Sequence, residues 1–169
     1  QVQAVGHRVV HGGVKFSQPV LVNDEVRKAI EDLIPLAPLH NPGALAGIDA
    51  SLAAFPKLKD RNVACFDTAF HSTMPACNYT YPIPYELSEK YGIRRYGFHG
   101  ISVEYVFNRA CKLMSADPMH TRMIVAHLGA GCSATAVRQG KSVDTTMGLT
   151  PLDGLMMGTR AGSGKMLIV

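Results

Sequence analysis

The segment from Met123 to Met147, "MIVAHLGAGCSATAVRQGKSVDTTM", constrains the fold more than any other part of the chain. Its apolar first stretch stops at a glycine-rich turn, and a second stretch of small and branched residues follows. The pair Gln139-Gly140 is then a signal for a two-residue hairpin before a third stretch begins. This pattern predicts three consecutive strands joined by tight turns.

The first half of the chain carries a different pattern, in which strands and helices alternate. The expected elements are a valine-rich strand, two helices and a buried strand, at residues 2–10, 24–34, from 42 onward, and 62–66. Asn23 and Asn41 stand just before the two helices and are the expected N-caps, with Pro42 at the first position of the second helix. Helices between strands here, and consecutive strands later, predict an α/β protein.

The middle of the chain, residues 68–100, is rich in proline and tyrosine and predicts irregular structure. Two helices are expected within or after it, near 85–91 and at about 101–115. The change of pattern predicts a domain boundary near residue 71. We therefore expect two parts, residues 1–71 and 72–169.

Composition argues against several classes of protein. The net charge of +4 is spread over 169 residues without a basic run, so a nucleic-acid-binding surface is not indicated. No apolar run reaches the length of about 20 residues that a membrane span requires. The four cysteines are far apart: Cys65, Cys77, Cys111 and Cys132. Their spacing fits neither a disulfide framework nor a zinc site, and it favours a reduced, cytoplasmic protein.

Five charged or histidine side chains stand at strand ends or in loops fixed by proline or glycine: Arg8, His40, Asp67, His99 and Arg160. Loops of this kind carry functional residues more often than helix faces do. A structural hydrogen bond or ion pair is the alternative explanation for each one taken singly. We treat the five as candidate site residues.

The turn "HLGAG", residues 127–131, is a candidate phosphate loop. Glycine lets a phosphate approach the main-chain N–H groups closely. The turn leads into a second strand instead of a helix, which is typical of the ATP sites of actin, Hsp70 and sugar kinases and not of dinucleotide-binding folds. A plain tight turn is the alternative interpretation.

Two other motifs do not carry a site. "GSGK" near the end is not a Walker-type loop, because Thr159 stands where the first glycine is required and Met166 follows Lys165. Cys65 with His71 as its base could form a nucleophile pair, but a cysteine on a buried strand is usually inert.

Six stretches, taken together and in order, resemble the acetate kinases and their propionate kinase relatives. They are "AVGHRVVHGG", "PLAPLHNP", "VACFDTAFHSTMP", "YGIRRYGFHG", "AHLGAGCS" and "KSVDTTMGLTPLDGLMMGTR". The resemblance covers residues 4 to about 161. It implies part of a two-lobed, ribonuclease-H-like fold, with residues 1–71 in the acetate-side lobe and 72–169 in the lobe that holds the phosphate hairpin. It also implies the reaction ATP + acetate ⇌ ADP + acetyl phosphate with Mg²⁺, whose ligands are expected mainly outside this chain.

The resemblance also implies roles for individual residues. Arg8 would bind the substrate carboxylate, and His99 and Arg160 would stabilise the phosphoryl group in transfer. The ATP phosphates would lie against His127, Leu128, Gly129, Ala130 and Gly131. The pocket for the methyl group would be formed by Val10, Leu39, Phe98 and Pro151, with His40 in a neighbouring loop.

Asp67 matches the residue that the family uses as an acid or base. A carboxylic acid of ordinary pKa is already ionised at neutral pH, so no proton need be removed from acetate. Our hypothesis is therefore that Asp67 orients an arginine or a magnesium-bound water.

The sequence departs from the family pattern in three places. Ala130 replaces the asparagine usual in the phosphate loop, Val103 ends the match after "HGIS", and "AGSGK" replaces the usual continuation after Arg160. The chain is also well under half the length of a typical member. We therefore expect open sheet edges, self-association as a homodimer and little turnover by the chain alone. Propionate kinase activity, or a non-catalytic module that binds anions or a partner chain, are the alternatives.

Overall fold

The computed structural model describes residues 2–164 and divides into two compact units, residues 1–69 and residues 70–169. We call them the N-terminal unit and the C-terminal unit and describe each by itself. Both combine helices with one small three-stranded sheet, so the α/β class predicted from the sequence is confirmed. None of the helices in the described residues is long and apolar enough to cross a membrane.

The N-terminal unit builds its sheet in the order β1-β3-β2. Its elements are β1 (Val5–Val9), β2 (Val20–Leu21), α1 (Asp24–Asp32), the 3₁₀ turn η1 (Ile34–Leu36), α2 (Asn41–Ala54), η2 (Pro56–Arg61) and β3 (Asn62–Phe66). β1 and β3 are parallel over five residue pairs, from Val5 with Asn62 to Val9 with Phe66. The two strands therefore end at the same edge of the sheet.

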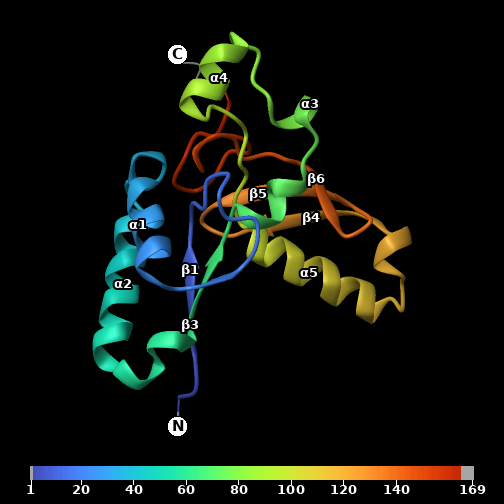
Figure 1. Cartoon of the computed structure of the whole chain (residues 1–169). Helices are drawn as coiled ribbons and strands as arrows, with labels where there is room; N and C mark the ends of the chain where they lie inside the picture. The colour runs from blue at the N-terminus through green and yellow to red at the C-terminus, as the bar shows by residue number, and fades with distance from the viewer. Residues whose placement is uncertain (1, 165–169) are drawn as a thin grey trace. The chain divides into compact units, whose positions relative to one another are not determined.

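Apolar residues of both strands and both helices form the core of this unit. Val9, Ile30, Ile48 and Phe66 are almost completely buried, and Phe66 stacks on Phe16 with ring centroids 4.4 Å apart. Figure 1 shows α1 and α2 lying side by side next to β1 and β3. The strands expected at 2–10 and 62–66 are confirmed, whereas the two-residue β2 was not predicted.

One predicted helix cap is confirmed and the other is wrong. The Asn23 side chain accepts a hydrogen bond from the Val26 N–H at the start of α1. Asn41 is the first residue of α2, and His40 occupies the N-cap position without a side-chain cap bond. The Asn41 side chain is fully buried and bonds to the main chain of His11 instead, because a buried amide takes the partners that the tertiary fold supplies.

The C-terminal unit is built on the antiparallel sheet β4-β5-β6. Its elements are η3 (Ala69–Thr73), α3 (Ala76–Tyr79), α4 (Tyr85–Tyr91), α5 (Gly100–Leu113), η4 (Pro118–His120), β4 (Arg122–Leu128), β5 (Cys132–Arg138) and β6 (Lys141–Thr145). Gln139 and Gly140 connect β5 to β6 with φ angles of 54° and 72°, both left-handed, as a two-residue hairpin turn requires. The three strands, the short helix at 85–91 and the long helix are therefore confirmed.

Helix α5 lies along one face of this sheet (Figure 1). Val103, Phe107 and Cys111 of the helix pack with Val125 and Val137 of the strands. Val106 of this helix and Met114 at its C-cap are exposed, because the buried stripe runs through Val103, Phe107 and Cys111.

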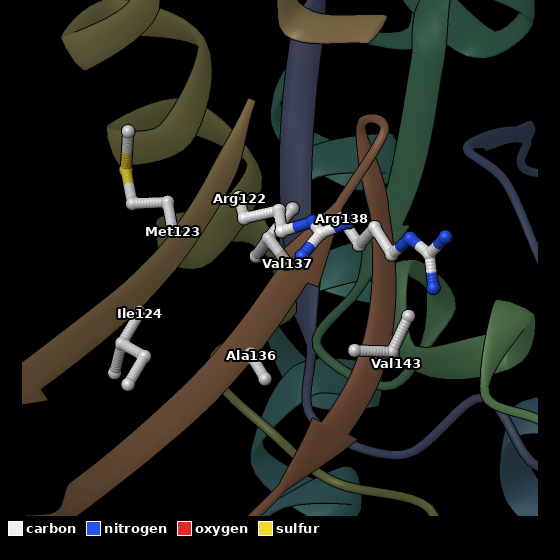
Figure 2. Close-up of a pocket in the computed structure, with 7 residues that line it drawn as sticks. All are labelled: Arg122, Met123, Ile124, Ala136, Val137, Arg138 and Val143. Atoms are coloured by element: carbon white, nitrogen blue, oxygen red, sulfur yellow. The ribbon is translucent and has the colours of Figure 1, made fainter. Parts of the chain in front are cut away.

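The other face of the sheet carries a shallow groove of about 310 Å³. Figure 2 shows Ile124, Ala136 and Val143 along it, with the guanidinium groups of Arg122 and Arg138 near the end where β4 begins and β5 stops. Ile124 is 76% exposed, which is unusual for an isoleucine in the middle of a strand. In the described part of the chain this face is therefore open.

Candidate functional site

An arginine–carboxylate pair lies where β1 and β3 end. The Arg8 Nε donates to Asp67 Oδ1 at 3.0 Å, and Nη2 donates to Oδ2 at 2.6 Å. This is the two-pronged geometry that a planar guanidinium makes with a carboxylate. The Asp67 side chain is only 2% exposed, whereas that of Arg8 is 62% exposed. The hydrogen bond from Arg8 to Asp67 raises the pKa of the guanidinium, which is charged at neutral pH in any case.

The loop beside this pair is fixed by buried hydrogen bonds. The Asp67 N–H donates to the Val9 carbonyl, and the Gly12 N–H donates to Thr68 Oγ1, both at 3.0 Å. Asn41 accepts from the His11 N–H and donates to the His11 carbonyl, both at 3.1 Å. A residue with a Cβ cannot replace Gly12 without displacement, since its Cβ would lie 2.9 Å from the Phe66 ring. Arg8 and the buried Val10 are thus held on a rigid segment.

The other candidates of this unit are less closely tied to the pair. Leu39 is 87% exposed, and His40 is half-buried at the N-cap of α2. A side chain as exposed as Leu39 does not line a closed pocket within this unit. Of the residues predicted in this unit, the structure brings Arg8 and Asp67 together. Val10 lies on the adjoining segment, which the hydrogen bonds of His11 and Gly12 hold in place.

The predicted phosphate loop is a hairpin turn in the C-terminal unit. Leu128 ends β4 opposite Cys132 at the start of β5, and the Gly129 N–H donates to the Gly131 carbonyl at 3.1 Å. The loop therefore joins two strands, as the sequence indicated, and presents a run of small residues at its tip.

Two histidines are stacked beside this turn. The rings of His99 and His127 lie 3.9 Å apart, centroid to centroid, and are inclined by 15°. Nδ1 of His99 is 2.9 Å from Ser133 Oγ, and Nδ1 of His127 is 2.9 Å from Ser102 Oγ. Each ring is thus oriented by one serine hydroxyl, and its Nε2 is directed away from that serine.

Arg160 and His99 converge on Gly131. A methyl group at Gly131 would lie 3.3 Å from Nη1 of Arg160 and 3.3 Å from Nε2 of His99. Nη1 of Arg160 also donates to the Pro151 carbonyl at 2.9 Å, which fixes the guanidinium. The space at the turn is therefore bounded by a cation, an imidazole nitrogen and glycine backbone, a set of groups suited to an anion.

Sequence reasoning missed the two serines. Ser133 is the cross-strand partner of His127, and Ser102 follows His99 by three residues on α5. The strand register and the helical spacing were both readable signals, but the sequence does not say which serine serves which ring. The strand register suggests Ser133 as the partner of His127, and the helical spacing suggests Ser102 as the partner of His99. In the structure the pairing is the reverse, because Ser133 bonds to His99 and Ser102 bonds to His127.

The remaining candidates of the C-terminal unit differ in burial and in hydrogen bonding. Phe98 is 1% exposed and is therefore a core residue of its own unit, whereas Pro151 is half-buried. Both ring nitrogens of His71 are bonded, Nδ1 to Ser142 Oγ at 2.9 Å and Nε2 to the Phe98 carbonyl at 2.8 Å, which leaves no nitrogen to act as a base. Among residues 2–164, no group of three or more His, Cys, Asp or Glu is placed to hold a metal ion. Lys165 of "GSGK" lies outside the described residues.

Known proteins resemble this chain over nearly its whole length. The model of the acetokinase family matches residues 1–169. The acetate kinase of Shewanella sp. (strain W3-18-1) is 57% identical over 162 residues, which are 96% of this chain and 40% of the relative. The acetate kinase of Yersinia pseudotuberculosis serotype O:3 (strain YPIII) is 56% identical over the same shares. The chain thus spans about two fifths of the length of these relatives.

Solved structures agree with this match. The Porphyromonas gingivalis acetate kinase is 50% identical, with a TM-score of 0.90 over 97% of this chain and 41% of that one. A propionate kinase from Francisella tularensis subsp. tularensis SCHU S4 is 54% identical, with a TM-score of 0.90 over 96% and 41%. These scores confirm the predicted fold class, a mixed α/β part of the two-lobed family fold. The chain belongs to the acetokinase family.

Proposed function

We propose that this chain supplies the carboxylate site and part of the phosphate site of an acetate kinase, which converts ATP and acetate to ADP and acetyl phosphate. The observation that carries the proposal is the convergence of His99 and Arg160 on the glycine turn at 129–131. Membership of the acetokinase family supports this substrate pair.

In the proposed reaction, a carboxylate oxygen of acetate attacks the terminal phosphorus of ATP in line with the departing ADP oxygen. One P–O bond forms, one breaks, and the acetate enters already ionised. The transition state carries its charge on the equatorial phosphoryl oxygens, so the protein contributes position and positive charge. Arg160 and the His99 ring supply that charge and a hydrogen bond, and the backbone of His127, Leu128, Gly129, Ala130 and Gly131 cradles the ATP phosphates.

Arg8 and Asp67 would act on the acceptor. Asp67 occupies Nε and Nη2 of Arg8, which leaves the N–H groups of Nη1 and the second N–H of Nη2 to bind acetate. Asp67 then orients the arginine and does not remove a proton. The two-pronged bond to the buried Asp67 supports the part of our hypothesis in which Asp67 orients an arginine.

ATP and Mg²⁺ belong to the proposal on the strength of the family. A magnesium ion would neutralise phosphate charge when bound, and the described residues offer no cluster of ligands for it. The residues of this chain orient the two substrates and stabilise charge.

Propionate kinase is the second candidate, favoured by the Francisella tularensis propionate kinase at 54% identity. By the family resemblance, Val10, Leu39, Phe98 and Pro151 would surround the methyl group of the substrate. Val10 is buried and directly follows β1, the strand that carries Arg8. One methylene changes the transition-state free energy by about 1–3 kcal/mol, so the choice should appear as a roughly tenfold or greater difference in kcat/KM. We propose acetate as the preferred substrate.

A cytoplasmic location and a homodimer complete the proposal. No disulfide joins the four cysteines, all of which lie in the described part of the chain, as is usual in a reducing compartment. Strands β4 and β6 each have one sheet neighbour among residues 2–164, and such edges favour association. Sedimentation analysis of the purified chain tests the dimer: a monomer at all concentrations contradicts it.

The experiment for the activity exchanges the matching 162 residues of the Shewanella enzyme for those of this chain. The chimera is given ATP, Mg²⁺ and acetate, and acetyl phosphate is trapped as the hydroxamate. We expect turnover that is lost in the Arg160→Ala chimera and kept in His120→Ala, since His120 is an exposed residue paired with Asp117. A folded chimera without turnover, whose parent enzyme is active, contradicts the kinase proposal and favours the anion-binding module. We expect little turnover from the 169-residue chain alone.

A further inference from the structure

His71 is a buried histidine that the proposed reaction does not use. It lies in η3 and is 0% exposed, in a unit whose other histidines either face the glycine turn or lie at the surface. Its Nε2 is 2.8 Å from the carbonyl oxygen of Phe98. A carbonyl oxygen only accepts hydrogen bonds, so Nε2 carries the proton. The second ring nitrogen, Nδ1, is 2.9 Å from the Ser142 hydroxyl, which can donate or accept a hydrogen bond.

The carbonyl that His71 holds belongs to the peptide group between Phe98 and His99. His99 has φ 60° and ψ 16°, the left-handed conformation that residues with a Cβ seldom adopt. Residues in such conformations keep them only where surrounding contacts impose them. The hydrogen bond from His71 to the Phe98 carbonyl is one such contact. It fixes the plane of the peptide group before His99, and the φ angle of His99 is measured from that plane.

The His71 ring also contacts the residue before Phe98. Gly97 has φ 73°, and a Cβ there would lie 2.9 Å from Cδ2 and Cγ of His71 and would collide with Thr145. The ring thus packs directly against the Gly97 backbone and bonds to the next carbonyl. Two successive residues before His99 are therefore held by one side chain.

We propose that His71 is a positioning residue for His99. Its Nε2–H fixes the Phe98 carbonyl, which holds His99 in its left-handed conformation and directs the His99 Nε2 toward Gly131, while Ser133 holds the other ring nitrogen. The benefit of this arrangement for phosphate recognition rests on the proposed function. The arrangement itself is a property of the ligand-free chain.

The test uses two substitutions that differ by one methylene. The amide of His71→Gln reaches about as far as Nε2 and keeps a donor for the Phe98 carbonyl, whereas the shorter amide of His71→Asn reaches only toward Ser142. Thr73→Val is the matched control, because it removes a hydrogen bond from the same 3₁₀ turn to the Ser142 carbonyl at 2.9 Å and leaves His71 in place. The ring signals of isotope-labelled histidines are recorded by NMR in the folded, ligand-free 169-residue chain.

We expect the His99 and His127 ring signals to move in His71→Asn and to stay near their wild-type positions in His71→Gln and Thr73→Val. The signals of the exposed His120 should stay in all three variants. Unmoved His99 signals in a folded His71→Asn chain overturn the proposal. If His71→Asn does not fold, the folded His71→Gln chain provides the test. Displaced His99 signals in His71→Gln then overturn the proposal as well.

ADP titration of the same samples separates this proposal from the proposed function. We expect the ADP dissociation constant to rise about tenfold in His71→Asn and to stay within about twofold in His71→Gln. If His99 moves in His71→Asn but the wild-type chain does not bind ADP, the positioning role stands and the phosphate site loses its support. If the wild-type chain binds ADP and His71→Asn binds it equally well with His99 unmoved, the positioning role fails alone.

Discussion

The two units hold their arginines in opposite ways. Arg8 of the N-terminal unit makes a two-pronged ion pair with a buried carboxylate, Asp67. Arg160 of the C-terminal unit donates to the neutral Pro151 carbonyl, and none of the ion pairs within residues 2–164 includes it. The charge of Arg8 is thus matched by a carboxylate of the protein, whereas Arg160 is held in place by an uncharged carbonyl oxygen.

The difference is informative because the two proposed ligands differ in charge. A single carboxylate such as acetate needs a guanidinium in a fixed direction more than it needs an unmatched charge. The phosphates of ATP carry several negative charges and favour a cation without a counter-ion. The same residue type is therefore suited to two tasks by the group that faces it, and the following substitutions test that contrast.

The largest effect is expected for Arg8→Ala. It leaves the buried Asp67 carboxylate without its partner, so the free energy of unfolding should fall by about 3 kcal/mol. Asp67→Ala leaves an arginine that water can reach, and should lower it by about 1–2 kcal/mol. Urea unfolding of the 169-residue chain measures both.

A matched control for this prediction is Arg27→Ala. Arg27 makes a similar fork with Asp49 at 2.7 and 2.6 Å, but both side chains are well exposed, at 40% and 44%. The loss should stay below about 1 kcal/mol, since water and salt screen an exposed pair. Equal losses for Arg8→Ala and Arg27→Ala contradict the view that burial of Asp67 sets the cost.

Arg160→Ala should act on binding and leave stability nearly unchanged. The loss of a charged donor to phosphate corresponds to about 2 kcal/mol, or roughly a thirtyfold higher dissociation constant for ADP. NMR titration measures it, with Arg122→Ala as the control because Arg122 is an exposed arginine at the far end of β4. An equal loss in the two variants means that binding depends on general charge and not on this site.

Gly131→Ala tests the closeness of the groups at the turn. The added methyl would meet Arg160 and His99 at 3.3 Å, so one of them must shift, and the ADP dissociation constant should rise about tenfold. Gly6→Ala is the control, since nothing lies within 4 Å of a methyl group there. Unchanged affinity in a folded Gly131→Ala chain shows that the turn does not contact the ligand.

The smallest effect is expected for Ala130→Asn, which restores the asparagine usual in the family's loop. One added amide at the turn should lower the ADP dissociation constant by about twofold to fivefold, the effect of one net hydrogen bond. Calorimetry or NMR titration can resolve such a change if the wild-type and variant chains are measured in parallel. A weaker affinity in Ala130→Asn indicates that this chain has adapted its turn to the alanine.

Much of the C-terminal sheet could be predicted because its signals are local. The Gln139-Gly140 turn and the glycines at 129 and 131 mark where strands stop, and a left-handed turn such as Gln139-Gly140 depends on only one or two residues. The cap at Asn23 was predictable for the same reason. The cap at Asn41 was not, because its side chain is engaged by the main chain of His11, thirty residues away in sequence.

The sequence by itself determined the family, the order of the main helices and strands, and the residue types of the candidate site. The tertiary structure alone decided which of these residues meet: Arg8 with Asp67 across 59 positions, His99 with Ser133 across 34, and His71 with the Phe98 carbonyl across 27. The physical reason is that turns and caps depend on a few neighbouring dihedral angles. A side-chain pair between distant segments depends on strand register and packing, which no short stretch of sequence contains.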